Sequence, residues 1–170
     1  MMMEQQGGGM LTAEEAKILS AVADRIFPRT DTPGAVEIGA VRYIEMALAG
    51  DYAALLPLYR QGLRALERFA QMQFGRRFDA LAEAQKDALL ANFASGAAPG
   101  FAKAAEFFEA VRYHVLEGVF CEPQYGGNRN LIGWRLVNFP GQQFGYDDAY
   151  INKRVDIEPI AVDSTKVSEK

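Results

Sequence analysis

Cysteine and histidine are almost absent from this sequence. Its 170 residues include one Cys and one His, at Cys121 and His114. A single Cys excludes an internal disulfide. The usual zinc sites are excluded as well, because they draw most of their ligands from Cys and His. Any chemistry that needs a thiol or an imidazole therefore depends on these two residues.

A positive excess of charge and long apolar runs are also missing. The formal net charge is −4 and the isoelectric point is about 5.1. This balance argues against nucleic acid or an anionic membrane surface as the main partner, because both require a basic footprint. No segment approaches the roughly 18 consecutive apolar residues of a membrane-spanning helix. We therefore expect no direct membrane span and no nucleic-acid partner.

What the sequence does contain is apolar residues at helical spacing. A chain of this length suits one domain with a proper core, and 49% hydrophobic with 24% charged residues is ordinary for a globular protein. The predicted fold class is mostly α, a single compact domain of about five helices followed by a long ordered loop region rich in Gly, Pro and aromatic residues. Residues 1–10 are expected to be disordered, residues 11–146 to form the helical domain, and residues 147–170 to form an extended or partly disordered tail.

The first expected helix has the clearest start and end. Thr12 and Glu15 form a capping-box pattern, and Pro28 ends the helix. Four further helices are expected over residues 33–50, 51–74, 81–93 and 101–120, with Pro33 in the first turn of the second helix and Asp51 as the N-cap of the third. In chain order, the expected inward faces are Ile18, Leu19, Val22 and Ile26; Val36, Val41, Ile44 and Leu48; Leu56, Tyr59, Leu63, Leu66 and Ala70; Leu81, Ala84, Ala88 and Phe93; and Phe101, Ala105, Phe108, Val111, Val115 and Val119.

The segment after Phe120, CEPQYGGNRNLIGWRLVNFPG, is the most distinctive stretch of the chain. Gly, Pro and Asn shape its backbone, while flexible linkers do not carry so many large apolar groups. It is therefore an ordered loop, with a short helical turn expected at 131–136. Two interpretations remain open: it closes the helical core, with Asn side chains satisfying turn amides, or it docks against a partner. The expected interface residues are Cys121, Pro123, Tyr125, Gly126, Gly127, Asn128, Asn130, Trp134, Pro140 and Gly141.

Two segments of the chain resemble a known family. ADRIFPRTDTPGAVEIGA upstream and GVFCEPQYGGNRNLIGWRLVNFPG downstream are similar to subunit 3, the gamma chain, of the gluconate 2-dehydrogenase type. The resemblance covers residues 11–146, most of the chain. Its most specific positions are Ile26-Phe27-Pro28, Thr30 to Ala35, Pro123, Tyr125 to Asn128, Gly133-Trp134 and Pro140-Gly141.

This resemblance implies an accessory role rather than catalysis. The family's small subunit accompanies a large FAD-dependent dehydrogenase subunit of the glucose-methanol-choline type, in complexes that oxidise gluconate, glucose, fructose or the 3-position of glucosides. The resemblance implies no cofactor in this chain, FAD in the partner subunit and haem c in a third, cytochrome c subunit of some complexes. The small subunit would stabilise the flavoprotein and help to mature or export it.

The resemblance also implies a periplasmic location. Residues 1–10 have neither the basic nor the apolar region of a secretory signal, so a cytoplasmic location stays open.

A stand-alone thiol enzyme is the first alternative, with Cys121 as nucleophile and His114 as base. The two residues are seven positions apart, which on a continuous helix is about 10.5 Å of rise, whereas the pair needs contact at about 3 Å. Only a break at Gly118 would bring them together. A second alternative is a helical interaction module unrelated to redox chemistry.

Three other patterns are weaker. His114 and Glu117 reverse the Glu-x-x-His order of di-iron sites, and only one His is present. The glycines near Asn128 lack the Gly-x-Gly-x-x-Gly spacing and the preceding strand of a dinucleotide site. Arginines recur every four residues and predict a solvated basic face or a surface for an acidic partner; they are Arg60, Arg64 and Arg68, with Arg76 and Arg77 nearby.

Overall fold

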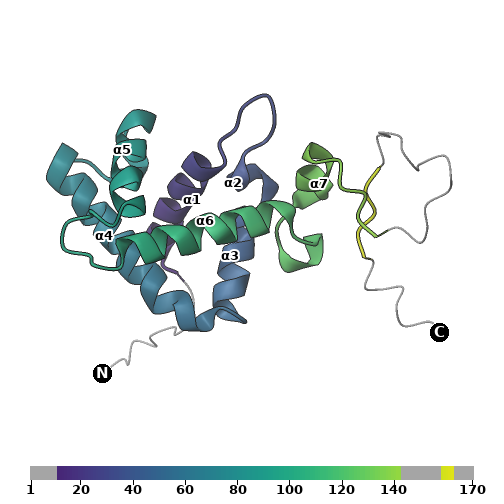
Figure 1. Ribbon diagram of the computed structural model, residues 1–170, viewed down its shortest axis with the longest axis horizontal. Coiled ribbons are helices and arrows are strands. Elements are labelled where there is room, and N and C mark those ends of the chain that lie inside the picture. Colours follow the sequence, from purple (N-terminus) through teal and green to yellow (C-terminus); the bar gives the residue numbers. More distant parts are fainter. Residues whose placement is uncertain (1–10, 143–157, 163–170) are drawn as a thin grey trace, which may run out of the picture.

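The computed structural model describes residues 11–142 and 158–162, and these residues form an all-α domain (Figure 1). The predicted helical fold class is confirmed. In the described ranges the only extended pairing is one isolated parallel bridge between Gly141 and Ile160. The helices are α1 (Ala13–Ile26), α2 (Ala35–Ile38), α3 (Ala40–Ala49), α4 (Leu56–Phe74), α5 (Glu83–Ala94), α6 (Ala104–Phe120) and α7 (Ile132–Leu136), with short 3-10 helices η1 (Ala53–Leu55), η2 (Phe78–Ala80), η3 (Pro123–Tyr125) and η4 (Arg129–Leu131).

Helix α6 is the central helix of the domain. It runs through the middle of the molecule in Figure 1 and contacts each of the other six α-helices. One side of it is completely buried, because apolar residues recur along it at helical spacing. The buried side includes Phe107, Val111, Val115 and Val119. Near its N-terminal end the prediction was off by one residue, since Phe107 rather than Phe108 occupies the core.

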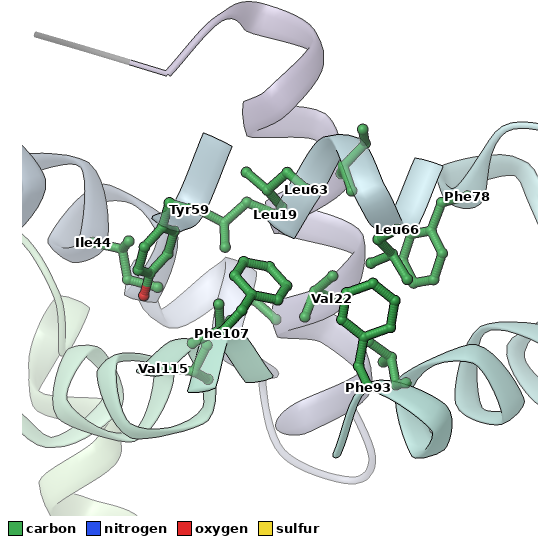
Figure 2. Close-up of a cluster of buried hydrophobic side chains, with 14 of the residues drawn as sticks. Leu19, Val22, Ile44, Tyr59, Leu63, Leu66, Phe78, Phe93, Phe107 and Val115 are labelled. Atoms are coloured by element: carbon green, nitrogen blue, oxygen red, sulfur yellow. The ribbon is translucent and has the colours of Figure 1, made fainter. Parts of the chain in front are cut away.

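The core is formed by residues of α1 to α6, and Figure 2 shows part of it. Leu19 and Val22 of α1 lie at its centre, and the ring of Phe107 from α6 packs beside them. That ring fits because α4 carries Gly62, where a Cβ atom would lie 2.2 Å from Phe107. Tyr59 of α4 meets the same ring edge-on, with the ring centroids 5.9 Å apart.

The second predicted helix is in fact two helices. Gly39 has φ of 98°, a left-handed conformation that ends α2 and starts α3. The break turns Val36 outward, so that 41% of its surface is exposed, although we expected it to face inward. Pro33 precedes the N-cap residue Gly34 and so lies outside the helix.

Two further predictions about helix starts and faces are wrong. Asp51 does not cap α4: η1 intervenes and α4 begins at Leu56. On α5, Ala84 and Ala88 are exposed, and the buried side is formed by Leu89, Leu90 and Phe93. Small Ala residues fit either side of a helix, so their spacing alone did not identify the core face.

The start of α1 is as predicted. The Thr12 side chain accepts a hydrogen bond from the Glu15 backbone at 3.1 Å, and the Glu15 carboxylate accepts one from the Thr12 backbone at 2.9 Å. Glu15 is buried, and Arg64 and Arg60 of α4 approach its carboxylate at 3.1 and 3.9 Å. These two arginines, which belong to the predicted basic face of α4, therefore neutralise this carboxylate and connect α4 to α1.

Residues 158–162 pack back against the domain. The Ile160 backbone donates to the Pro140 carbonyl at 3.1 Å, and the Gln142 backbone donates to the Ile160 carbonyl at 2.9 Å. The Val162 amide donates to Glu122 Oε1 at 3.0 Å. The expected disorder of residues 1–10 lies outside the described residues, and so does most of the expected extended or partly disordered tail, residues 147–157 and 163–170. Among the described helices, none has the length and apolar character to cross a membrane.

Candidate functional site

The segment that follows α6, residues 121–141, is called the C-terminal loop below. Asn128 organises it and has no exposed surface. Its backbone donates to the Gly118 carbonyl at 2.8 Å and its side-chain amide donates to the Cys121 carbonyl at 2.9 Å, while its side-chain oxygen accepts from the Gly133 backbone at 2.9 Å. Helix C-termini leave unpaired carbonyls, and Asn128 satisfies two at the end of α6. The loop is thus bonded to the helix it follows.

Glycines let the C-terminal loop approach α6 at backbone contact distance. A Cβ atom on Gly127 would lie 2.0 Å from the Gly118 carbonyl oxygen, and one on Gly133 would lie 1.9 Å from the Val119 carbonyl oxygen. Gly126 has φ of 94°, and a Cβ atom there would lie 2.6 Å from the sulfur of Met46. These glycines therefore allow close packing of the loop against α6 and α3.

Trp134 closes the inner side of the loop. Only 5% of its surface is exposed, and its indole N–H donates to the Phe120 carbonyl at 2.7 Å. The ring of Phe139 packs on it edge-on at 5.0 Å between centroids, and Gly141 lies close enough that a Cβ would be 2.7 Å from the indole ring. Trp134 is therefore part of the structural closure of the domain.

The outer side of the loop carries exposed apolar side chains. Tyr125 is 55% exposed, Val137 58% and Phe139 47%. Isolated exposed apolar residues are common on soluble proteins, but several on one short segment suit a binding surface better. The expected interface residues thus fall into three groups. Gly127, Asn128 and Trp134 are buried on the inner side of the loop, and Tyr125 and Asn130 are exposed. The partly buried residues are Cys121, Pro123, Gly126, Pro140 and Gly141.

A groove of about 610 Å³ opens beside Tyr125. We call it the acidic groove, because every charged residue that lines it in the described part of the chain is a carboxylate. It lies between α3, the turn that follows it and the C-terminal end of α6, elements that sequence reasoning did not connect with the loop. The lining residues used below are Tyr43, Met46, Asp51, Tyr52, Glu117, Glu122 and Tyr125.

Glu117 is the polar centre of the acidic groove. The Tyr43 hydroxyl donates to Glu117 Oε2 at 2.8 Å, and the Tyr52 hydroxyl lies 3.4 Å from both carboxylate oxygens. Burial and the neighbouring carboxylate raise the pKa of Tyr43, and the same two causes raise the pKa of Tyr52. Both hydroxyls therefore keep their protons and act as donors. No motif marks this cluster in the sequence, because Tyr43 and Glu117 are 74 residues apart.

The only imidazole lies behind this cluster. His114 is buried, its Nδ1 lies 2.7 Å from the Tyr59 hydroxyl, and its ring stacks on Tyr52 with centroids 4.5 Å apart. Burial lowers the pKa of His114, which Glu117 opposes only in part. The imidazole is thus a neutral packing group between two tyrosines.

The structure does not assemble the proposed thiol dyad. Helix α6 is unbroken from His114 through Gly118 to its C-cap at Cys121, so the two residues stay about 10.5 Å apart along the axis. The Cys121 thiol instead donates to the Gly118 carbonyl at 3.7 Å. Burial raises the pKa of Cys121, which is the opposite of an activated nucleophile.

The di-iron pattern is not assembled either. Among the described residues, no group of three or more His, Cys, Asp or Glu side chains could hold a metal ion. Glu117 is engaged by two tyrosines and His114 by a third, so each already has a structural role.

The comparisons with known proteins give one match. Residues 13–141, from the start of α1 to the end of the C-terminal loop, match the model of a protein family described as gluconate 2-dehydrogenase subunit 3. The comparison with curated proteins and the comparison with solved structures gave no match. The family match spans the helical core, the loop and the acidic groove between them. The chain belongs to the gluconate 2-dehydrogenase subunit 3 family.

Proposed function

We propose that this chain is the non-catalytic small subunit of an FAD-dependent sugar or sugar-acid dehydrogenase complex. Membership of a family of dehydrogenase subunits over residues 13–141 is the observation that carries the proposal. In this proposal the large partner holds FAD and oxidises a sugar hydroxyl, and electrons pass to a cytochrome c subunit or another acceptor. The small subunit stabilises the flavoprotein and helps its maturation and export to the periplasm.

Features of the described residues support an accessory role. The thiol and the imidazole are separated and engaged in packing, so they supply no nucleophile and base. The C-terminal loop, by contrast, is held rigidly by Asn128 and presents Tyr125 outward. A rigid surface with exposed aromatic groups binds with a small loss of conformational entropy. Binding to the folded partner then stabilises that partner by mass action.

Co-expression tests this proposal. The flavoprotein subunit would be produced with and without the small chain, and its soluble yield, FAD content and sugar oxidation would be measured. We expect a stable complex that buries well over about 1,000 Å², and a flavoprotein that is less soluble and poorer in FAD when produced alone. Equal yield and flavin content in the two preparations would contradict the maturation role.

The isolated chain offers a complementary measurement. We expect it to be colourless and inactive on sugars with an artificial electron acceptor. Flavin or haem absorbance that stays with the purified chain would contradict the assignment of the cofactors to the other subunits. Protease protection in intact cells tests the proposed periplasmic location.

A further inference from the structure

We propose that the acidic groove receives a lysine or arginine side chain of the flavoprotein subunit, with Glu117 as its counter-ion. This inference rests on the proposed function, because it assumes a protein partner. The inference goes beyond the proposed function because it locates a specific contact on α3 and α6, outside the C-terminal loop.

The charge of the groove is the first argument. Asp51, Glu117 and Glu122 are its charged lining residues, and within residues 11–142 and 158–162 no Lys, Arg or His lines it. Arg42, next to Tyr43 in the chain, is exposed and is not among the lining residues. Complementary charge across an interface favours a cationic group here and disfavours an anionic one.

The carboxylates have acceptor capacity left for such a cation. An ionised carboxylate offers about four lone-pair positions. Glu117 Oε2 receives one short bond from Tyr43 at 2.8 Å, whereas the contact of Oε1 with the Tyr52 hydroxyl is longer, at 3.4 Å. Glu122 Oε1 accepts from the Val162 backbone, while its buried Oε2 has no hydrogen-bond partner among the described residues. Because buried acceptors without a donor are costly, a guanidinium or ammonium group arriving here would gain bonds that the described part of the chain does not make.

The walls of the groove suit the aliphatic stem of a long cationic side chain. Met46 is 46% exposed and Tyr125 is 55% exposed, and both line the groove beside the tyrosine rings. Lys and Arg bury their methylene stems on apolar surface while the charged head finds a polar partner. Aromatic rings also attract the cation itself.

A free metal ion is a poorer occupant than a protein side chain. The described residues contain no group of three or more acidic, His or Cys side chains suited to holding a metal ion. The groove also opens next to the exposed side of the C-terminal loop, so a partner that covers Tyr125 reaches the groove with the same surface.

The test compares the binding of groove variants to the recombinant flavoprotein subunit. That subunit would be identified by mass spectrometry of the flavin-containing complex purified with the tagged chain. In Glu117→Gln the side chain keeps its shape and still accepts from Tyr43, but the charge is gone. We expect its affinity to fall about tenfold or more, with a smaller dependence of affinity on salt than in the wild type.

A matched control lies on the same helix. Glu109 of α6 is exposed and pairs with Arg112 at 2.7 Å, outside the groove. Glu109→Gln should bind within about twofold of the wild type, because surface ion pairs contribute little. Met46→Lys adds a positive charge at the exposed rim of the groove and should weaken binding more than Met72→Lys, which adds the same charge at a 71% exposed site on α4. Melting temperatures of all four variants separate folding from binding.

Each outcome has a distinct meaning. If the wild-type chain does not bind the flavoprotein, both the proposed function and this inference are wrong. If the wild type binds and the groove variants bind equally well, the inference is wrong and the proposed function stands. If Glu117→Gln instead increases hydrogen exchange of residues 163–170 in the free chain and leaves partner affinity unchanged, the groove holds the chain's own end, and the inference is again wrong.

Discussion

The inner and outer sides of the C-terminal loop differ in almost every physical property. The inner side, formed by Gly127, Asn128 and Trp134, is buried, and Asn128 and Trp134 donate hydrogen bonds to carbonyls at the end of α6. The outer side, with Tyr125 and Phe139, exposes large rings to solvent. One short segment thus combines domain closure and an exposed aromatic surface. Domain closure and an exposed binding surface are therefore compatible here, because different residues of the same loop face opposite ways.

We expect the largest effect on stability from Trp134→Ala, which removes a buried side chain on the inner side of the loop. This substitution removes a buried ring and leaves the Phe120 carbonyl without its indole donor. Deleting a buried aromatic side chain lowers the free energy of unfolding by about 4 kcal/mol. Urea unfolding followed by circular dichroism would measure it. A loss below about 1 kcal/mol would show that the inner side is not part of the core.

Gly127→Val should act on the same side with a somewhat smaller effect. A Cβ atom there would lie 2.0 Å from the Gly118 carbonyl oxygen and 2.9 Å from the Cys121 sulfur, so the backbone must move. We expect a loss of about 3 kcal/mol in unfolding free energy, together with weaker partner binding. Gly75→Val is the control, because a Cβ atom at Gly75 meets nothing within 4 Å, although its positive φ adds some strain. If the two variants melted alike, the close approach of loop and helix would be wrong.

Tyr125→Ala tests the outer side of the C-terminal loop. Because the side chain is 55% exposed, the free energy of unfolding should change by no more than about 0.5 kcal/mol. Partner binding should weaken by about 2 kcal/mol, as for other aromatic residues at the centre of an interface. Calorimetric melting of the free chain and titration with the flavoprotein separate the two effects. A drop of ten degrees or so in the melting temperature, with affinity intact, would place Tyr125 in the core instead.

The smallest effect concerns pH and the buried imidazole behind the acidic groove. Burial lowers the folded-state pKa of His114 below the ordinary 6.5. Below about pH 6.5 the unfolded chain therefore binds a proton at His114 that the folded chain does not. The free energy of unfolding that depends on His114 is thus constant above that pH and falls as the pH drops toward the folded-state pKa. Each unit of pKa difference amounts to about 1.4 kcal/mol. Unfolding curves of the wild type and His114→Gln, measured between pH 5 and pH 8, isolate the contribution of the imidazole. This range extends about one unit or more on each side of the ordinary pKa of 6.5. If the free energies of unfolding of the two proteins changed in parallel with pH, the prediction would be wrong.

Helical periodicity predicted the core where large apolar residues repeat. Leu63 and Leu66 of α4 and Val111 and Val115 of α6 are buried as expected, because a branched or bulky side chain has one favourable side of an amphipathic helix. Predictions from helical periodicity were wrong where the residue is a small Ala or where the backbone adopts a left-handed conformation. Ala84 and Ala88 gave no reliable direction, and Gly39 broke a helix that looked continuous in the sequence.

The unusual composition of the C-terminal loop identified it as an ordered element, but not which of its residues face inward. That depends on contacts such as Gly127 with Gly118 and Trp134 with Phe120. These two contacts join residues nine and fourteen positions apart, and such separations follow no fixed period, unlike the helix and strand repeats. Residue types therefore suggested a binding surface, and the fold divided it into two sides.

The helical class, the start of α1, the main buried stripes and the family resemblance follow from the sequence alone, because each depends on local spacing or on a contiguous motif. That Glu117 meets Tyr43 and Tyr52 follows, by contrast, only from the way the helices pack. The physical reason is distance along the chain: the Tyr43 and Glu117 contact joins residues 74 positions apart. Such a contact depends on how α3 packs against α6, and no repeat within either helix encodes it.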